Sequence, residues 1–182
     1  MKKDPKIFNL GRHLLAEYYE CNPNILNNVQ LIEDVMTEAA VRCGATVVQK
    51  NFHHFSPYGV SGVVIISESH LAIHTWPEYG YASVDLFTCG DSCHPEIAYD
   101  YLQDKLNSGS AFYSELKRGL IHTETKGQPH PDQLIKTPFV VALQQQTFGS
   151  QQTPAKTGKT KAVKVKAASA KAGSGKEANT HG

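Results

Sequence analysis

The stretch from Ser61 to Asp91 reads SGVVIISESHLAIHTWPEYGYASVDLFTCGD, and it decides the fold. Its β-branched and aromatic residues predict three neighbouring strands at about 60–67, 70–76 and 80–88, the last two separated by a turn at Pro77–Gly80. The same stretch carries more serine, histidine and carboxylate side chains than a core strand needs. Because a buried polar group without a partner costs roughly 1–3 kcal/mol, we infer that this sheet lines a site.

The residues before this stretch predict a strand and a helix. Apolar side chains alternate along residues 8–20, which is typical of a strand. We expect Asn24 to cap the helix at its start, and Gly44 to follow its end in the left-handed conformation. An apolar stripe with a spacing of three or four residues marks this helix: Ile25, Val29, Ile32, Met36, Ala39 and Cys43.

The remaining elements complete a mixed fold. A strand is predicted at 45–55 and another at 111–119, and Pro95 suits the first position of a second helix. The second helix is expected to bury four residues: Ile97, Tyr101, Leu102 and Leu106. Two helices among strands joined by short turns favour an α+β fold, a two-layer sandwich in which an antiparallel sheet has its helices packed on one face.

The chain divides by composition into a folded domain at 1–127, a weakly structured extension at 128–149 and a disordered Lys/Ala-rich tail at 150–182. An apolar run at 137–148 predicts a weakly packed segment within the extension. From Pro154 onward there are seven Lys and one Glu, whereas the rest holds eleven Lys or Arg against sixteen Asp or Glu. The body is therefore mildly acidic and the tail basic, and the tail could contact nucleic acid through its phosphates.

Composition also limits the compartment and the chemistry. No apolar run approaches the roughly 18 residues of a membrane helix, and MKKDPKIFNL lacks the apolar segment of a secretory signal, so we expect a cytoplasmic protein. Four cysteines in 182 residues do not suggest a disulfide framework. The cluster of Cys89, Cys93 and His94 fits no strong zinc pattern, and we expect no metal.

Individually, the polar residues of the central stretch have ordinary explanations. Ser69 lacks the glycines of a hydrolase nucleophile elbow, and a single histidine in a sheet is commonly structural. On a regular strand His70 and His74 share a face, whereas Ser69 and His74 lie on opposite faces. If Ser69 and His74 act on one centre, either a bulge intervenes or the two residues come from different subunits.

Three segments together resemble a known family. The central stretch, LGRHLLAEYYEC at 10–21 and FHHFSPYGVSG at 52–62 closely resemble the short prokaryotic S-adenosylmethionine decarboxylase proenzymes. The similarity covers about residues 9–120, and the central motif is long enough to be highly specific. The Lys/Ala-rich tail departs from the family pattern.

The resemblance implies a proenzyme that cleaves itself between Glu68 and Ser69. The Ser69 hydroxyl would attack the Glu68 carbonyl to give an ester, and loss of the Ser69 α-proton would eliminate the Glu68 carboxylate. The residue left behind would become a pyruvoyl cofactor, which forms a Schiff base with the substrate amine and acts as an electron sink. The implied reaction converts S-adenosyl-L-methionine into S-adenosylmethioninamine, the aminopropyl donor for spermidine biosynthesis.

The family's other roles carry over to matching positions. His74 matches the processing base, Ser61 matches the serine that supports the ester, and Cys89 matches the proton donor to the product carbon. The substrate-binding residues implied are Phe55, Trp76 and Glu78. Aromatic faces attract a sulfonium cation, and a carboxylate can accept two hydrogen bonds from a ribose diol. The resemblance also implies a homodimer whose subunits share each site.

Two alternatives remain open on the sequence. The first is a pyruvoyl-dependent arginine or ornithine decarboxylase on the same fold, although the residues implied for the adenosyl group argue against it. The second is an unprocessed binding protein whose basic tail contacts nucleic acid, although intact Ser69, His74 and Cys89 argue against it.

Overall fold

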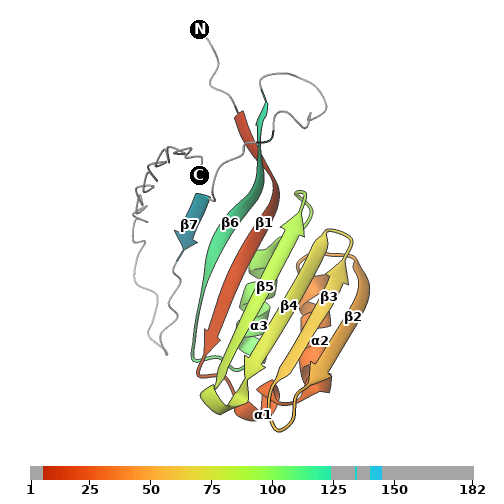
Figure 1. Ribbon diagram of the computed structural model, residues 1–182, viewed down its shortest axis with the longest axis vertical. Helices are drawn as coiled ribbons and strands as arrows, with labels where there is room; N and C mark the ends of the chain where they lie inside the picture. The colour runs from red at the N-terminus through yellow and green to blue at the C-terminus, as the bar shows by residue number, and fades with distance from the viewer. Residues whose placement is uncertain (1–5, 124–133, 135–139, 145–182) are drawn as a thin grey trace, which may run out of the picture.

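The computed structural model describes residues 6–123, 134 and 140–144. Within them, seven antiparallel strands form one sheet in the order β2-β3-β4-β5-β1-β6-β7 (Figure 1). The strands are β1 (Lys6–Tyr19), β2 (Val47–His54), β3 (Val60–Ile66), β4 (Ser69–Trp76), β5 (Tyr81–Cys89), β6 (Ser110–Thr123) and β7 (Val140–Gln144). The helices are α1 (Pro23–Leu26), α2 (Val29–Arg42) and α3 (Pro95–Lys105), with a 3₁₀ turn η1 at Pro77–Tyr79.

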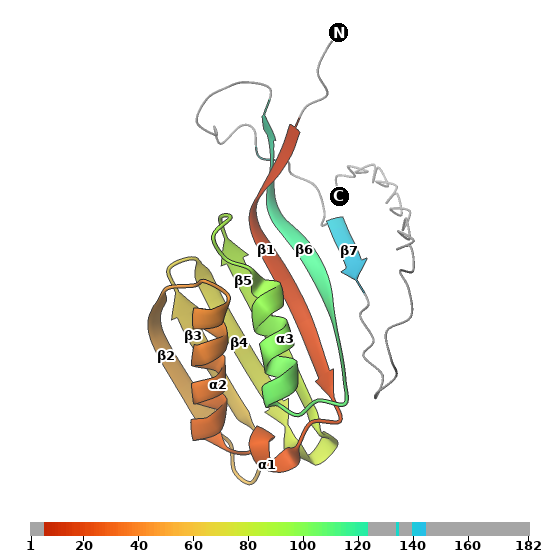
Figure 2. The same ribbon diagram turned by 180° about the vertical axis from the view of Figure 1, so that it is seen from behind.

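Helices α2 and α3 lie side by side on one face of the sheet, which confirms the predicted two-layer α+β sandwich (Figure 2). Burial alternates along the central strands, because successive strand residues point to opposite faces. Leu71, Leu86 and Leu14 follow one another across β4, β5 and β1 and are fully buried under the helices. We call the opposite side the open face; it carries, among others, Ser61, His70, His74, Asp85 and Phe87.

The predicted apolar stripe of the first helix is confirmed, but its predicted start is wrong. Ile32, Met36, Ala39 and Cys43 are buried, and Ile25 and Val29 pack against the core. The helix begins after Asn28, whose Oδ1 accepts a hydrogen bond from Leu31 N, and not after Asn24. The short α1 precedes it, capped by Asn22. Gly44 follows α2 with φ +89°, as predicted.

The second helix begins at Pro95 as predicted, but one member of its predicted stripe is wrong. Leu102 and Leu106 are buried and Tyr101 packs against the core, whereas Ile97 is exposed. The buried side of α3 is centred instead on Ala98 and Tyr99. The Tyr18 hydroxyl donates to the Tyr99 carbonyl, and this bond ties α3 to β1.

Part of the predicted extension is a strand. Residues 140–144, inside the apolar run predicted at 137–148, form β7 and pair with Tyr113–Lys117 of β6. The predicted disordered tail at 150–182, and with it the nucleic-acid contact, lies outside the described residues. Among the described helices, none is both long and apolar enough to cross a membrane.

Candidate active site

Ser61 and His74 face each other across β3 and β4. They are register partners, and Ser61 Oγ lies 2.7 Å from His74 Nδ1. Both line a hollow of about 300 Å³ on the open face, together with residues of β2 that include His53. A histidine held by a serine and open to solvent can accept a proton from a group that enters this hollow.

The three residues predicted to bind substrate lie near this end of β4. The Trp76 ring is 6.3 Å from the His74 ring and is partly exposed. Phe55 follows β2, packs edge-on against His53 at 4.7 Å and is about half exposed. Glu78 is exposed in η1 and, with Tyr58, lines a separate hollow of about 330 Å³.

The Glu68–Ser69 peptide lies at the other end of β4, in the turn that joins it to β3. The Glu68 carbonyl accepts a hydrogen bond of 2.9 Å from the backbone N–H of Cys89, and its side-chain Oε2 accepts one of 3.1 Å from Thr46 N. Ser69 has a φ of +154°, which is unusual for a residue that has a Cβ. The peptide is thus fixed on its carbonyl side and held in an unfavourable conformation on its amide side.

The Cys89 thiol packs against a glycine, whose lack of a side chain leaves room for the sulfur atom. Cys89 is half-buried at the end of β5, opposite Gly11 of β1. A Cβ on Gly11 would lie 3.2 Å from Cys89 Sγ and 2.7 Å from the Phe87 ring. Cys89 is one of four free cysteines, and among the described groups none is placed to hold a metal.

Within one chain, the predicted site residues therefore form two separate groups. Glu68, Ser69 and Cys89 lie at the start of β4, whereas Ser61 and His74 lie toward its end. Because β4 is a regular strand, five residue steps separate Ser69 from His74 by about 16 Å. The pairings of β4 with β3 and β5 are continuous, so no bulge between Ser69 and His74 brings the two residues together. Of the two arrangements that the sequence allowed, this leaves residues from different subunits.

The site also contains a residue to which the sequence analysis gave no role. His70 Nδ1 lies 3.3 Å from Ser69 Oγ, and the His70 ring packs edge-on against Phe87 at 5.7 Å. Adjacent strand residues normally face opposite ways, so only the unusual backbone of Ser69, which the sequence does not reveal, brings these two side chains together.

Ionisable groups surround Asp85 in the middle of the open face. His13 Nε2 lies 3.5 Å from Asp85 Oδ1, and Arg118 Nη1 lies 3.2 Å from His13 Nδ1. The contact with His13, with further attraction from His70 and His74, holds the pKa of Asp85 below its ordinary value despite partial burial. The centre of the open face therefore carries a carboxylate at neutral pH.

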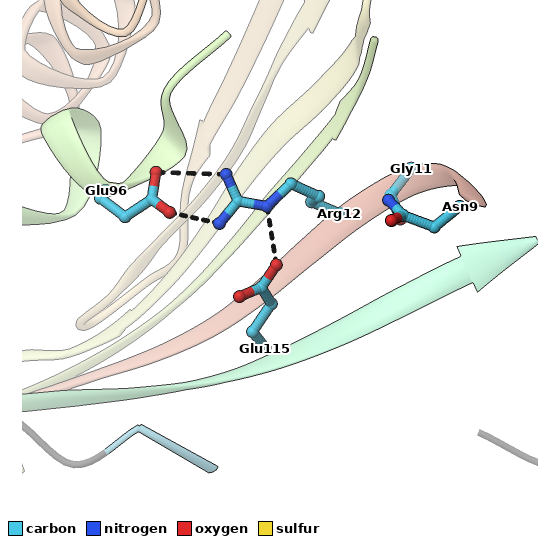
Figure 3. A network of polar contacts seen from close by, with 5 residues as sticks. All are labelled: Asn9, Gly11, Arg12, Glu96 and Glu115. Carbon is cyan, nitrogen blue, oxygen red and sulfur yellow. Dashed lines mark hydrogen bonds and ion pairs between the residues drawn. The ribbon is translucent and has the colours of Figure 1, made fainter. Parts of the chain in front are cut away.

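A second polar network lies under the helices, on the other side of the sheet. Arg12 Nε donates to Glu115 Oε1 at 2.7 Å, and its terminal nitrogens pair with Glu96 of α3 (Figure 3). Glu115 is buried, and the hydrogen bond that it accepts is the main reason that the pKa of Arg12 is raised above its ordinary value. This network ties α3 to β1 and β6 and fixes the strand that carries Gly11.

Comparisons with known proteins agree on one family. The family model described as S-adenosylmethionine decarboxylase matches residues 12–119. The S-adenosylmethionine decarboxylase proenzyme from Thermosipho melanesiensis is 60% identical to this chain, over 61% of this chain and 85% of the relative. The proenzyme of the same name from Acidithiobacillus ferrooxidans is 53% identical, over 62% of this chain and 85% of the relative. The crystal structure of the adenosylmethionine decarboxylase from Aquifex aeolicus matches with a TM-score of 0.60 and 35% identity, covering 66% of this chain and 98% of that one.

The matched region runs from β1 to β6, so it contains both groups of predicted site residues and the sheet that holds them. On this sequence and structural evidence, the chain belongs to the S-adenosylmethionine decarboxylase family.

Proposed function

We propose that this chain is a proenzyme that cleaves its own backbone between Glu68 and Ser69 and then decarboxylates S-adenosyl-L-methionine, supplying S-adenosylmethioninamine for spermidine biosynthesis. The observation that carries the proposal is the hydrogen bond of 2.9 Å from Cys89 N to the Glu68 carbonyl. If the Ser69 hydroxyl adds to this carbonyl, the oxygen becomes an oxyanion, and a backbone N–H already in place stabilises that charge.

The conformation of Ser69 supports the same cleavage site. Its φ of +154° lies outside the regions that residues with a Cβ favour. The uncleaved chain carries the strain of this conformation. Cleavage frees the amide side of the peptide, so the products no longer carry it. The residues around this bond therefore fit conversion of Ser69 into a pyruvoyl group.

A pyruvoyl group at position 69 would supply a carbonyl that withdraws electrons from the α-carbon of the substrate. Cys89 would hold a proton for that carbon, since its thiol belongs to the residue whose N–H contacts Glu68. Trp76 and Phe55, both partly exposed, would face the adenine and the sulfonium group. Glu78 would accept hydrogen bonds from the ribose hydroxyls.

The complete site would be shared between two copies of the chain. The separation of about 16 Å along β4 keeps His74 away from Ser69 of its own chain. Two copies could stack open face to open face around a two-fold axis that lies between the faces, perpendicular to β4 and near Ala72. This axis would reverse the direction of the strand and bring His74 of one copy over Ser69 of the other. Exposed Ile65 and Trp76 on the open face support burial of that face between two stacked sheets.

Two measurements test the proposal. The intact mass of the purified full chain under denaturing conditions should reveal two species, one ending at Glu68 and one beginning with a pyruvoyl group at position 69. Ser69→Ala should give only the full-length mass and release no carbon dioxide from S-adenosylmethionine. A cleaved and active Ser69→Ala variant would move the site elsewhere, whereas an uncleaved wild-type chain would favour the binding-protein alternative.

The substrate and the compartment follow the same reasoning. The identity to named S-adenosylmethionine decarboxylases favours this substrate over arginine or ornithine, and carbon dioxide release from each of the three compounds separates them. The four free thiols fit a reducing compartment, so we propose a cytoplasmic enzyme. Localisation of a fluorescent fusion checks this.

A further inference from the structure

His70 has the position of a base for the first step of the proposed self-cleavage. Its Nδ1 lies 3.3 Å from Ser69 Oγ, the atom that must lose a proton to become a nucleophile. The distance is slightly long for a strong hydrogen bond, and such contacts commonly shorten as the reaction begins.

The His70 ring is held in this position by neighbouring strands. It is the register partner of Phe87 on β5 and packs edge-on against that ring, with the centroids 5.7 Å apart. The other side of Phe87 contacts His13, at 5.1 Å, so the phenyl ring is fixed from two directions. A base that is fixed before the reaction loses little orientational freedom when it acts.

An anionic side chain lies on the same face of the sheet as His70. Asp85 lies two residues from Phe87 on β5, and a charge on His70 lowers the pKa of this carboxyl. A transient imidazolium next to Ser69 would thus have an anionic neighbour on the same face of the sheet.

We propose that His70 is the general base that activates Ser69 in self-cleavage, an inference that rests on the proposed function. The Ser69 Oγ–H proton passes to His70 Nδ1 while Oγ forms a bond to the Glu68 carbonyl carbon, and the oxyanion accepts the Cys89 N–H. The Glu68 C–N bond then breaks, and His70 returns the proton to the departing Ser69 amine. The product is an ester, with the proton count unchanged.

This assignment gives the two histidines different steps of the self-cleavage. His70 acts on Ser69 of its own chain to form the ester. His74, about 16 Å along the strand, can reach Ser69 only from another copy and would act later, on the Ser69 α-proton. Hydroxylamine distinguishes the two steps, because it cleaves an ester under conditions that leave a peptide bond intact.

The test compares His70→Asn with His74→Ala in the full chain, by intact mass before and after hydroxylamine. Asn retains a hydrogen-bond acceptor near the Nδ1 position but cannot take the proton. We expect His70→Asn to cleave roughly 100-fold more slowly than wild type and to resist hydroxylamine. His74→Ala should remain full length but split on hydroxylamine treatment. His122→Asn, an exposed change on β6, is the matched control and should cleave normally.

Two results would overturn the assignment: wild-type cleavage of His70→Asn, or build-up of hydroxylamine-sensitive chains in that variant. If His70→Asn does not fold, as judged by circular dichroism, His70→Gly with added imidazole replaces it, and failure of imidazole to restore cleavage counts against the proposal. Failure of the wild-type chain to cleave would instead remove the proposed function, and the role of His70 with it.

Discussion

Gly11 and Cys89 lie opposite each other on β1 and β5, and the missing side chain of the glycine leaves space for the thiol. The two residues are 78 positions apart in the sequence. Their proximity makes Gly11 a determinant of where the thiol of Cys89 points.

Gly11→Ala is therefore expected to impair decarboxylation through Cys89 and self-cleavage through Phe87. The new Cβ would crowd Cys89 Sγ at 3.2 Å, and at 2.7 Å it would displace the Phe87 ring that holds His70. A misplaced thiol should lower kcat/KM roughly 10–100-fold, measured on the cleaved enzyme. Leu10→Ala, an exposed change on the same strand, should leave both rates unchanged, and equal loss in the two variants would contradict the explanation.

Mixed dimers provide a direct test of shared sites. When Ser69→Ala and His74→Ala chains are produced together, one site of a mixed dimer combines an intact Ser69 with an intact His74. We expect fragments from the His74→Ala chain only, identified by a mass tag. Neither chain produced alone should yield them. Fragments that are absent from the mixture would mean that the site lies within one chain.

The stability of the η1 end of the sheet depends on the buried hydroxyl of Thr75. Its Oγ1 accepts from Val60 N at 2.8 Å and donates to the Leu26 carbonyl at 2.9 Å. Thr75→Val keeps the shape but leaves both backbone groups without this partner, so we expect a loss of about 1–3 kcal/mol in the free energy of unfolding. Urea titration of the uncleaved Ser69→Ala chain measures it. Thr75→Ser, which retains the hydroxyl, should lose less than Thr75→Val.

The Arg12 network should contribute more to stability than an ion pair on the surface. Removing Arg12 leaves the buried Glu115 without its cation, and Arg12→Met should cost about 3–5 kcal/mol in the same titration. Arg42→Met removes an exposed pair with Glu38 and should cost about 1 kcal/mol or less. Adding Glu115→Gln to Arg12→Met should recover part of the loss. Equal costs for the two single variants would mean that burial of Glu115 is unimportant.

Much of the fold was readable because hydrophobic spacing reports which face is buried. Leu14, Ala16 and Tyr18 alternate along β1 and all three are buried, which agrees with the strand predicted at 8–20. The start of α2 was predicted wrongly because four asparagines precede this helix. Asn28 caps α2, whereas the Oδ1 of Asn27 accepts from Gly59 N, 32 residues away. The exposure of Ile97 was also missed, because packing against α2, β1 and β5 selects the side of α3 that carries Tyr99.

The sequence proposed the residues of the candidate site but could not give their arrangement. The pairing of Ser61 with His74 follows from strand register, which a single sequence does not specify. The contact between Ser69 and His70 depends on one φ angle that departs from ordinary strand geometry. Residue types suggested which side chains take part, whereas the separation of those residues between the two ends of β4 is a property of the fold.

The strand order has a consequence for what a cut at residue 68 would leave behind. The first fragment would hold β1, β2 and β3, and the second would hold β4 through β7. Because β1 lies between β5 and β6, the N-terminal fragment would pair with the C-terminal fragment on both sides of β1. The two fragments would also pair where β3 meets β4. The mature protomer would then be a non-covalent heterodimer with interlocked subunits. Its melting temperature should rise more steeply with protein concentration than that of the uncleaved Ser69→Ala chain, because unfolding of the cleaved homodimer releases four polypeptides instead of two.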